Sequence, residues 1–366
     1  MMNSRGQFGM NQRKPIKILA SLIVAALFWA TLLAGSGLAD FRFVFLADSR
    51  GDYKEGPNGM INETELKAIR DKIVALNPQP DFVVFGGDMA SRIGNAEGDD
   101  TFLRRWVEVM SPLTTNPTRP DEIQLYVVKG NHEIYDEAKP PDYRHSNQVL
   151  YQQVFKDMPD TYPPGHPNYA KLAYYFEYGE GQEKSLFVVL DSYYMWQVKD
   201  KKKTVDKILE GGITDTQLNW LDGLLKNTDA VHKFVFSHMP VFPVSSTLKR
   251  DKKSLEALWK NMDLYKVAMF FCGHEHLYDK MILDGSVDKD MKNAVVQVIA
   301  GDAGAPFSKY TSVDPAVTRW TVTKKNNYVV VDVKGAAIIY EACGGAKAQG
   351  YTRIDSGVVG NSCCGN

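Results

Sequence analysis

The chain has 366 residues, of which 44% are hydrophobic and 24% are charged, and its formal net charge is -1. This length and composition are those of a globular protein with room for one large domain or two smaller ones. The near-neutral charge offers no electrostatic basis for binding nucleic acid or an anionic membrane surface, so no nucleic-acid specificity is evident.

The amino-terminal segment has the pattern of an export signal. Four basic residues precede an apolar stretch over residues 18–33, and small residues occupy positions Gly37 and Ala39. A basic region, an apolar region and a small-residue cleavage site define a signal peptide. We therefore expect removal of residues 1–39, a periplasmic or secreted protein, and no stable membrane anchor after cleavage. An uncleaved anchor through the same apolar segment is the alternative, because its length is close to that of a spanning helix.

Five short apolar runs have the composition of buried strands, and each run ends in potential metal ligands. The runs cover residues 41–47, 81–87, 125–130, 233–237 and 267–273. The polar residues that follow them are, in order, Asp48, Asp88, Asn131-His132-Glu133, His238 and His274-Glu275-His276. In an open α/β sheet, side chains at the carboxyl ends of the strands gather in one crevice. Because carboxylate, amide and imidazole groups together suit a pair of metal ions, the pattern predicts a dinuclear metalloenzyme.

Helical segments alternate with these strands, which predicts a layered α/β architecture. Apolar residues at helical spacing predict helices over residues 62–76, 99–113 and 253–262, and the capping box that begins at Thr214 predicts another. Further strands are expected at 173–178, 185–190, 294–300, 328–333 and 336–340. Residues 138–169, rich in Pro and Tyr, are expected to form a long loop over the sheet edge or the mouth of the site. This loop and residues 95–101 are the expected determinants of specificity.

The carboxyl-terminal residues 343–366 are rich in glycine and cysteine, and we expect them to form a tail after one domain over residues 40–342. Cys343 is expected to pair with Cys363 or Cys364, because an exported protein can keep disulfides and neighbouring cysteines are badly placed to pair with each other. Cys272 closes an apolar strand and is expected to be a small buried hydrophobic residue.

The ordered clusters resemble the signature of calcineurin-like metallophosphoesterases, which include purple acid phosphatases. The most specific parts are Gly130-Asn131-His132-Glu133 and Gly273-His274-Glu275-His276, and the resemblance spans residues 41–305. It implies a four-layer α/β/β/α sandwich with two divalent or trivalent metal ions, either iron, zinc or manganese, at the strand ends. Matched residue by residue, it implies that the first metal is held by Asp48 and His276, the second by Asn131, His238 and His274, and both by Asp88.

The resemblance implies hydrolysis of a small-molecule phosphomonoester or phosphodiester by attack of a metal-bridging hydroxide. His132 is the candidate acid that protonates the leaving group. Glu133 either orients the His132 ring or is a surface carboxylate. Two other functions remain open. One is a non-catalytic phosphate- or metal-binding protein with a degenerate first metal site, and the other is a different metallohydrolase, such as a nucleotidase or a sugar- or lipid-phosphate diesterase.

One position departs from the family pattern. Most members have a histidine two residues after the first aspartate, as a further ligand of the first metal, but this chain has Arg50. Arginine stays protonated and has no lone pair to give, so it cannot replace that ligand. The first metal then binds more weakly, or Asp52 or a tyrosine completes its shell, or Arg50 makes a bidentate contact to the substrate phosphate. We favour the phosphate contact over a structural salt bridge from Arg50.

Overall fold

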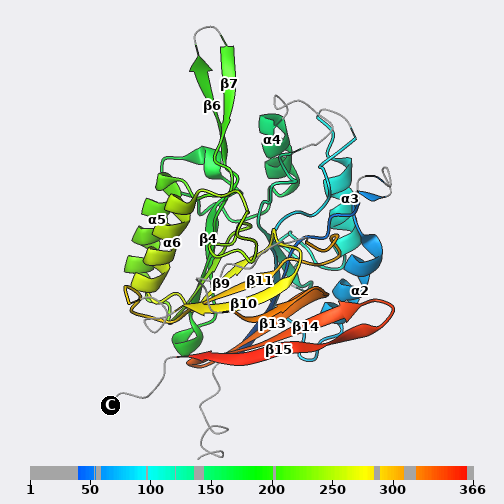
Figure 1. Cartoon of the computed structure of the whole chain (residues 1–366), viewed down its shortest axis with the longest axis vertical. Coiled ribbons are helices and arrows are strands. Elements are labelled where there is room, and N and C mark those ends of the chain that lie inside the picture. Colours follow the sequence, from blue (N-terminus) through cyan, green and yellow to red (C-terminus); the bar gives the residue numbers. More distant parts are fainter. Residues whose placement is uncertain are drawn as a thin grey trace, which may run out of the picture. The chain divides into compact units, whose positions relative to one another are not determined.

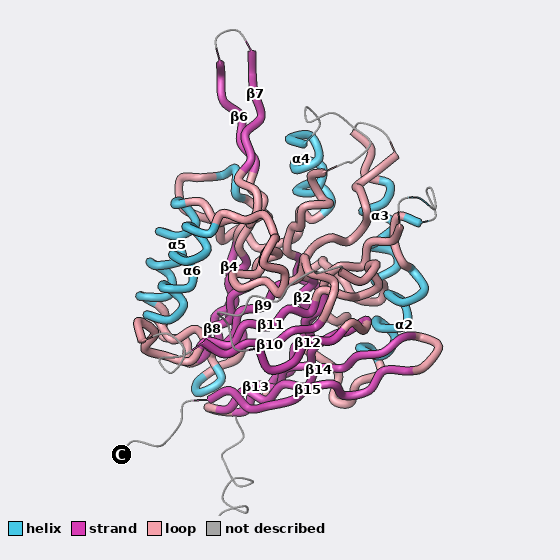
Figure 2. Tube along the Cα trace, viewed as in Figure 1, coloured by secondary structure: helices cyan, strands magenta, loops and turns pink. Residues whose placement is uncertain are grey.

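Two β-sheets form the centre of the computed structural model (Figures 1 and 2). The six-stranded sheet has the order β15-β14-β13-β1-β2-β3, with bounds Gly350–Gly360, Ala337–Ala346, Asn326–Lys334, Phe41–Leu46, Phe82–Phe85 and Gln124–Val127. The seven-stranded sheet has the order β12-β10-β11-β9-β8-β5-β4, with bounds Arg319–Thr323, Tyr278–Leu283, Val295–Ala300, Met269–Cys272, His232–Phe236, Ser185–Val189 and Tyr174–Tyr178. A separate antiparallel pair, β6 (Met195–Asp200) and β7 (Lys203–Ile208), projects away from both sheets (Figure 1).

The structure describes residues 40–52, 54, 59–95, 98–119, 121–135, 144–200, 203–283, 289–308 and 319–360. All of these residues belong to one compact unit, Ala39–Asn366. The expected signal peptide, residues 1–39, lies outside the described residues, and so do the paired-cysteine positions Cys363 and Cys364. No described helix combines the length and the apolar character needed to cross a membrane.

The two sheets pack face to face through buried phenylalanines. The ring of Phe43 on β1 lies 5.4 Å from that of Phe187 on β5 and 5.1 Å from that of Phe234 on β8. The ring of Phe45 lies 5.1 Å from that of Phe271 on β9. Each aromatic pair stabilises the fold by roughly 0.5–1.5 kcal/mol beyond its buried area. This core therefore holds the ends of β1 and β2 next to the ends of β8 and β9.

Helices cover the outer faces of both sheets, which completes the four-layer sandwich (Figure 1). On one side lie α2 (Glu63–Val74), α3 (Thr101–Met110) and α4 (Arg144–Val154), and on the other lie α5 (Asp215–Asn227) and α6 (Lys252–Leu264). The predicted starts of two of these helices, α2 and α5, are confirmed. The side chain of Asn62 accepts a hydrogen bond from the Glu65 amide at the start of α2, and that of Thr214 accepts one from the Gln217 amide at the start of α5. The expected sandwich is thus the observed fold.

The carboxyl-terminal region differs from the expected tail. Cys343 lies inside β14 as a buried free thiol, and residues 350–360 form β15, which pairs antiparallel with β14. Glycine is required within β15 at Gly357, because a Cβ atom there would lie 2.7 Å from the Tyr340 hydroxyl. Residues 343–360 are therefore an edge of the six-stranded sheet. Cys272 is fully buried, as expected.

The expected loop over residues 138–169 contains regular structure. Residues 144–154 form α4, and a short 3-10 helix, η3, covers Pro167–Tyr169. The expected residues 138–143 of this loop lie outside the described part of the chain. The helix was not predicted because its sequence is mostly polar, with few apolar residues at helical spacing.

Candidate metal centre

The five ligand clusters converge from both sheets onto one place. Strands β1, β2 and β3 run parallel in the six-stranded sheet, and β8 and β9 run parallel in the other. Each of these strands ends a few residues before one of the clusters, so their carboxyl ends carry the side chains to the same edge of the sandwich.

Two groups of buried side chains have the composition of metal sites. Ligand atoms of Asp48, Asp88 and His276 all lie within 4.8 Å of one another, and the same holds for Asp88, His238 and His274. His276 Nε2 is 3.5 Å from Asp48 Oδ1, and His238 Nε2 is 3.4 Å from Asp88 Oδ1. Because Asp88 belongs to both groups, the arrangement can hold two cations that share its carboxylate.

Asn131 adds an amide oxygen to the second group. Its Oδ1 lies 2.9 Å from His274 Nδ1 and 3.1 Å from His238 Nε2, and these two nitrogens are 3.2 Å apart. Burial and the positive charge of His238 lower the pKa of His274 to about 3, so the His274 imidazole is neutral and has a lone pair to donate. Three donor atoms directed at one point fit a cation.

The histidine rings are fixed by backbone carbonyls on their outer side. His238 Nδ1 donates to the carbonyl oxygen of Gly86 over 2.8 Å, and His276 Nδ1 donates to that of Pro306 over 2.5 Å. Since a carbonyl oxygen only accepts, each Nδ1 carries a proton and each Nε2 faces the carboxylates, where it would give its lone pair to a cation after losing any proton it holds. This is the usual outer support of a metal-ligating histidine.

The electrostatics of the site also favour a bound positive charge. Burial alone would raise the pKa of Asp88, yet the imidazoles of His238 and His132 hold it well below its usual range. Burial lowers the pKa of His238, but the carboxylates of Asp88 and Asp48 outweigh this effect and raise the pKa to about 10. Asp48 Oδ1 is buried and has no hydrogen-bond partner. The residues present therefore fit a pair of metal ions.

Three of the candidate ligands have an unusual backbone conformation. Asp48, Asp88 and His274 have φ angles of 62°, 55° and 69°, in the left-handed region that residues other than glycine adopt infrequently. Such a conformation costs of order 1–3 kcal/mol for each residue and clusters at functional sites. The sharp turn after each strand aims the side chain at the centre.

Glycines let the ligand loops approach one another. A Cβ atom at Gly130 would lie 2.3 Å from Asp88 Oδ1, and one at Gly273 would lie 2.3 Å from Asp48 Oδ2. Neither position has room for a side chain. The glycine that opens Gly-Asn-His-Glu and the one that opens Gly-His-Glu-His are therefore required by the packing of each loop against a carboxylate from β1 or β2.

Glu133 has neither of the two predicted roles. Its buried carboxylate accepts hydrogen bonds from the backbone amides of Asp88, Met89 and Gly130, over 2.9, 2.8 and 2.7 Å. Burial and the nearby Asp88 carboxylate raise its pKa to about 7. Glu133 thus holds the Asp88 loop against its own loop. It is not a surface group, and the His132 ring is held instead by the Ser91 carbonyl, 3.0 Å from Nδ1.

Residues 41–278 match the family model described as calcineurin-like phosphoesterase. The chain belongs to this family. Among solved structures, it is similar to purple acid phosphatase PPD1 of yellow lupin (Lupinus luteus), with a TM-score of 0.62 and 13% identity over 88% of this chain and 54% of that one. GAP50 of Plasmodium gives a TM-score of 0.56 and 14% identity, over 88% and 89% of the two chains. PhoD gives 0.55 and 11%, over 88% and 73%.

This member of the calcineurin-like phosphoesterase family spans about half the length of the lupin phosphatase chain. The low identities mean that the similarity to these structures shows a shared fold. No curated protein matches the sequence.

Arg50, the departure from the family pattern, lies beside the candidate acid. Its backbone amide donates to the Asp88 carbonyl over 3.2 Å, and its positive charge adds to burial in lowering the pKa of His132. Its Nε is buried without a partner, and no described carboxylate forms an ion pair with its guanidinium. Asp52 is exposed and accepts a hydrogen bond from the Lys54 amide, and neither metal-ligand group of the described residues includes it. Within the described part of the chain, Arg50 therefore forms no salt bridge and Asp52 belongs to neither group of candidate ligands.

Several supporting residues had no sequence signal. The Glu275 carboxylate is buried and accepts hydrogen bonds from the backbone amides of Val244 and Ser245, over 2.5 and 2.7 Å, which ties the loop after His238 to the Gly-His-Glu-His loop. The Tyr193 ring lies 6.0 Å from the rings of both His238 and His274.

Asp191 takes part in a buried ion pair beneath the centre. Lys129 Nζ lies 3.0 Å from Asp191 Oδ2, and both side chains are inaccessible to solvent. Asp191 Oδ1 accepts from the Tyr193 amide over 2.9 Å, and Lys129 Nζ donates to Gln148 Oε1 over 2.6 Å. The pair therefore connects the residue before Gly130 to the segment that carries Tyr193. Asp302 is also buried, and neither metal-ligand group of the described residues includes it.

Proposed function

We propose that this chain is a metal-dependent hydrolase of phosphomonoesters or phosphodiesters. The observation that carries the proposal is the pair of buried ligand groups that share Asp88, with His132 beside them. Two metal ions in such a site supply an activated water and neutralise the phosphoryl oxygens. The chain's own residues must then bind the phosphoryl group and protonate the leaving group.

His132 is placed to act as the general acid. Its ring is 9% exposed, so one edge reaches the site, and Nε2 lies 3.9 Å from Asp88 Oδ2. The hydrogen bond from Nδ1 to the Ser91 carbonyl fixes the ring and leaves Nε2 to transfer a proton. Arg50, with its unpartnered Nε next to His132, is the candidate phosphate ligand.

The test is hydrolysis of p-nitrophenyl phosphate and bis-p-nitrophenyl phosphate by the full-length chain supplied with iron, zinc or manganese. We expect turnover with two ions bound per chain. His132→Ala should lower kcat by about 10²–10⁴, the usual contribution of a general acid, without loss of metal. His166→Ala, which changes an exposed histidine on the loop before η3, is the matched control.

A non-catalytic binding function is the competing interpretation, because Arg50 replaces an expected ligand. The fold alone does not decide between the two, since the similar GAP50 is described as an anchor in the inner membrane complex of Plasmodium. Two bound ions with no turnover of either ester would contradict the enzyme and support the binding protein. Turnover that depends on His132 would show that the protein is not merely a non-catalytic binding protein.

We also propose that the protein is exported, on the evidence of the basic, apolar and small-residue pattern in residues 1–39. Cleavage should leave a mature chain that begins at Asp40. Amino-terminal sequencing of the protein recovered outside the cytoplasm tests this, and a membrane-bound chain with an intact amino terminus would favour the anchor instead.

A further inference from the structure

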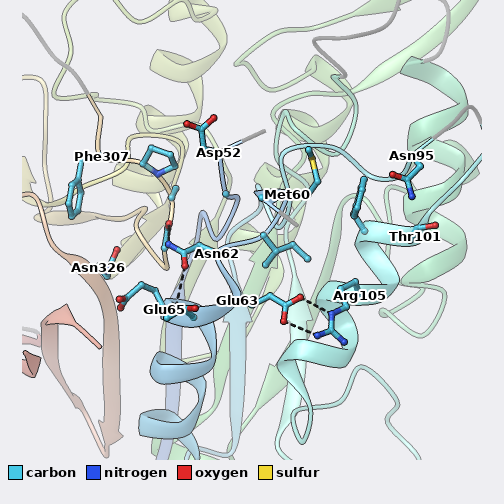
Figure 3. A pocket seen from close by; sticks show the side chains of 18 residues that line it. Asp52, Met60, Asn62, Glu63, Glu65, Asn95, Thr101, Arg105, Phe307 and Asn326 are labelled. Atoms are coloured by element: carbon cyan, nitrogen blue, oxygen red, sulfur yellow. Dashed lines mark hydrogen bonds and ion pairs between the residues drawn. The ribbon is translucent and has the colours of Figure 1, made fainter. Parts of the chain in front are cut away.

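A groove of about 960 Å³ lies near the candidate metal centre, and Figure 3 shows the side chains that line it. Its walls come from the starts of α2 and α3, from residues 304–307 and from the start of β13. Residues 95 and 101, at the ends of the expected specificity segment, line it. The volume lies within the range of small-molecule sites, roughly 300–1,000 Å³.

The groove adjoins the side of the centre that holds Asp48 and His276. Its lining residue Gly51 follows Arg50 directly, and Ile61 pairs with Arg50 in an isolated β-bridge. The amide of Ala305 donates to the Asp48 carbonyl over 3.1 Å, and the Pro306 carbonyl accepts from His276. None of the candidate metal ligands lines the groove. It is therefore a separate site, and its wall is joined to the metal centre through the backbone of Arg50.

The charges in the groove exclude an anionic ligand. Arg105 is the one cationic residue among the described residues that line it, and Glu63 binds its guanidinium over 2.7 and 2.8 Å (Figure 3). Glu63 also accepts from Lys67, and Glu65 accepts from the Tyr351 hydroxyl over 2.8 Å. With its cation neutralised and its carboxylates in excess, the groove has no group free to bind a second phosphate or a carboxylate. The two glutamates are paired, so Asp52, which accepts from the Lys54 amide, is the one carboxylate among the described lining residues left to bind a hydroxyl or an ammonium group.

The groups that remain free suit hydroxyl groups. Asn326 is only 7% exposed, and its side-chain amide forms no hydrogen bond with another described residue although it lines the groove. Asn95 offers a second such amide. An amide both donates and accepts, which matches an alcohol better than it matches an ion. The ring of Phe307 is 47% exposed and provides an apolar face for carbon-bound hydrogens.

We infer that this groove binds the alcohol portion of the substrate, and that this alcohol is an uncharged, hydroxyl-rich group of the sugar type. The inference rests on the proposed function for the phosphate end of the substrate. Arg50 at the junction holds the phosphate, while Asn326 and Phe307 hold the sugar.

The experiment compares kcat/KM of the full-length chain for glucose 6-phosphate, phosphocholine, 3-phosphoglycerate and p-nitrophenyl phosphate. We expect glucose 6-phosphate to exceed phosphocholine and 3-phosphoglycerate by about tenfold or more, because phosphocholine has no hydroxyl group for the amides to bind and 3-phosphoglycerate brings a carboxylate to a groove with carboxylates in excess. Asn326→Ala and Phe307→Ala should each lower the ratio of glucose 6-phosphate to p-nitrophenyl phosphate activity by about tenfold. Asn227→Ala and Leu264→Ala, exposed residues on α5 and at the end of α6, are the matched controls.

Binding of glucose 6-phosphate by calorimetry, in the slow His132→Ala background, separates this inference from the proposed function. Weaker binding of glucose 6-phosphate after Asn326→Ala would support sugar binding in the groove, even if the protein hydrolysed no ester. Preference for 3-phosphoglycerate or phosphocholine would overturn the inference while leaving the phosphoesterase intact. Unchanged selectivity and unchanged affinity in both groove variants would overturn it as well.

Discussion

We expect Arg50 to influence both metal binding and substrate binding, because it occupies the position of a metal-ligating histidine in the family pattern and its charge helps to lower the pKa of His132. Arg50→His restores an imidazole there, so we expect tighter binding at the first metal site. It also removes the guanidinium, so KM for p-nitrophenyl phosphate should rise by about tenfold, as when one charge-assisted contact is lost. Metal content by elemental analysis and steady-state kinetics measure the two effects.

Arg119→His is the control for this substitution, since Arg119 is largely exposed and pairs only with Glu122 at its surface. Arg119→His should change neither the metal content nor KM for p-nitrophenyl phosphate. Unchanged metal content together with unchanged KM in Arg50→His would mean that position 50 does not face the centre.

Asp302 makes stability depend on pH. Burial raises the pKa of its carboxyl to about 8, whereas an unfolded aspartate has a pKa of about 3.9. The folded state keeps a proton that the unfolded state releases, so this contribution is fully present below about pH 4 and is lost as pH rises toward 8. Asp302→Asn imitates the protonated form, so its advantage in free energy of unfolding should grow by about 2–5 kcal/mol between pH 4 and pH 8.

Urea unfolding of both proteins at several pH values, with a chelator present so that no cation contributes, measures this advantage. Oδ2 of Asp302 has no hydrogen-bond partner, so the substituted amide displaces none. An advantage that stays constant across this pH range would show that Asp302 is ionised in the folded protein.

At the scale of loops and strands, the packing of Gly130 against Asp88 is the feature most sensitive to substitution. In Gly130→Ala the new Cβ would meet Asp88 Oδ1 and also the Asp88 backbone nitrogen, at 2.5 Å. Because backbone cannot swing aside, we expect a loss of about 1–3 kcal/mol in stability and a loss of bound metal. Thermal unfolding and metal analysis report the two effects.

Gly223→Ala is the opposite case and serves as the control. Gly223 lies inside α5, and a Cβ there meets nothing within 4 Å. Alanine in a helix interior is more stable than glycine by roughly 0.5–1 kcal/mol, so this variant should gain stability and keep its metal. If both variants had the same stability and the same metal content, the close packing of Gly130 against Asp88 would be contradicted.

The strands and the positions of the candidate ligands were predictable from sequence because their signals are local. Each candidate ligand follows a buried apolar run within a few residues, as Asp48 follows β1. The roles of Glu133 and Glu275 were not predictable, because their backbone partners Met89 and Val244 lie 44 and 31 residues away in the chain. The strand β15 was missed for a related reason: glycine there is set by the distant Tyr340 ring, and glycine-rich sequence otherwise indicates a loop.

At the scale of the whole molecule, the candidate metal centre takes its ligands from both sheets. Asp48, Asp88 and Asn131 follow strands of the six-stranded sheet, whereas His238, His274 and His276 follow strands of the seven-stranded sheet. Ions bound between these residues would connect the two sheets. Binding to the folded state alone stabilises that state by mass action.

Removal of the metals should therefore lower the melting temperature of the protein. One site at a free ion concentration of 100 times its Kd contributes about 2.7 kcal/mol, which corresponds to a shift of roughly 4 °C for a domain of about 320 residues. Calorimetry with and without a chelator measures the shift, and Asp88→Asn, which removes the shared carboxylate, should abolish most of it. Identical melting curves for the wild-type protein in both conditions would show that the two sheets are held together by their aromatic core alone and that the ligand groups bind no ion in the folded chain.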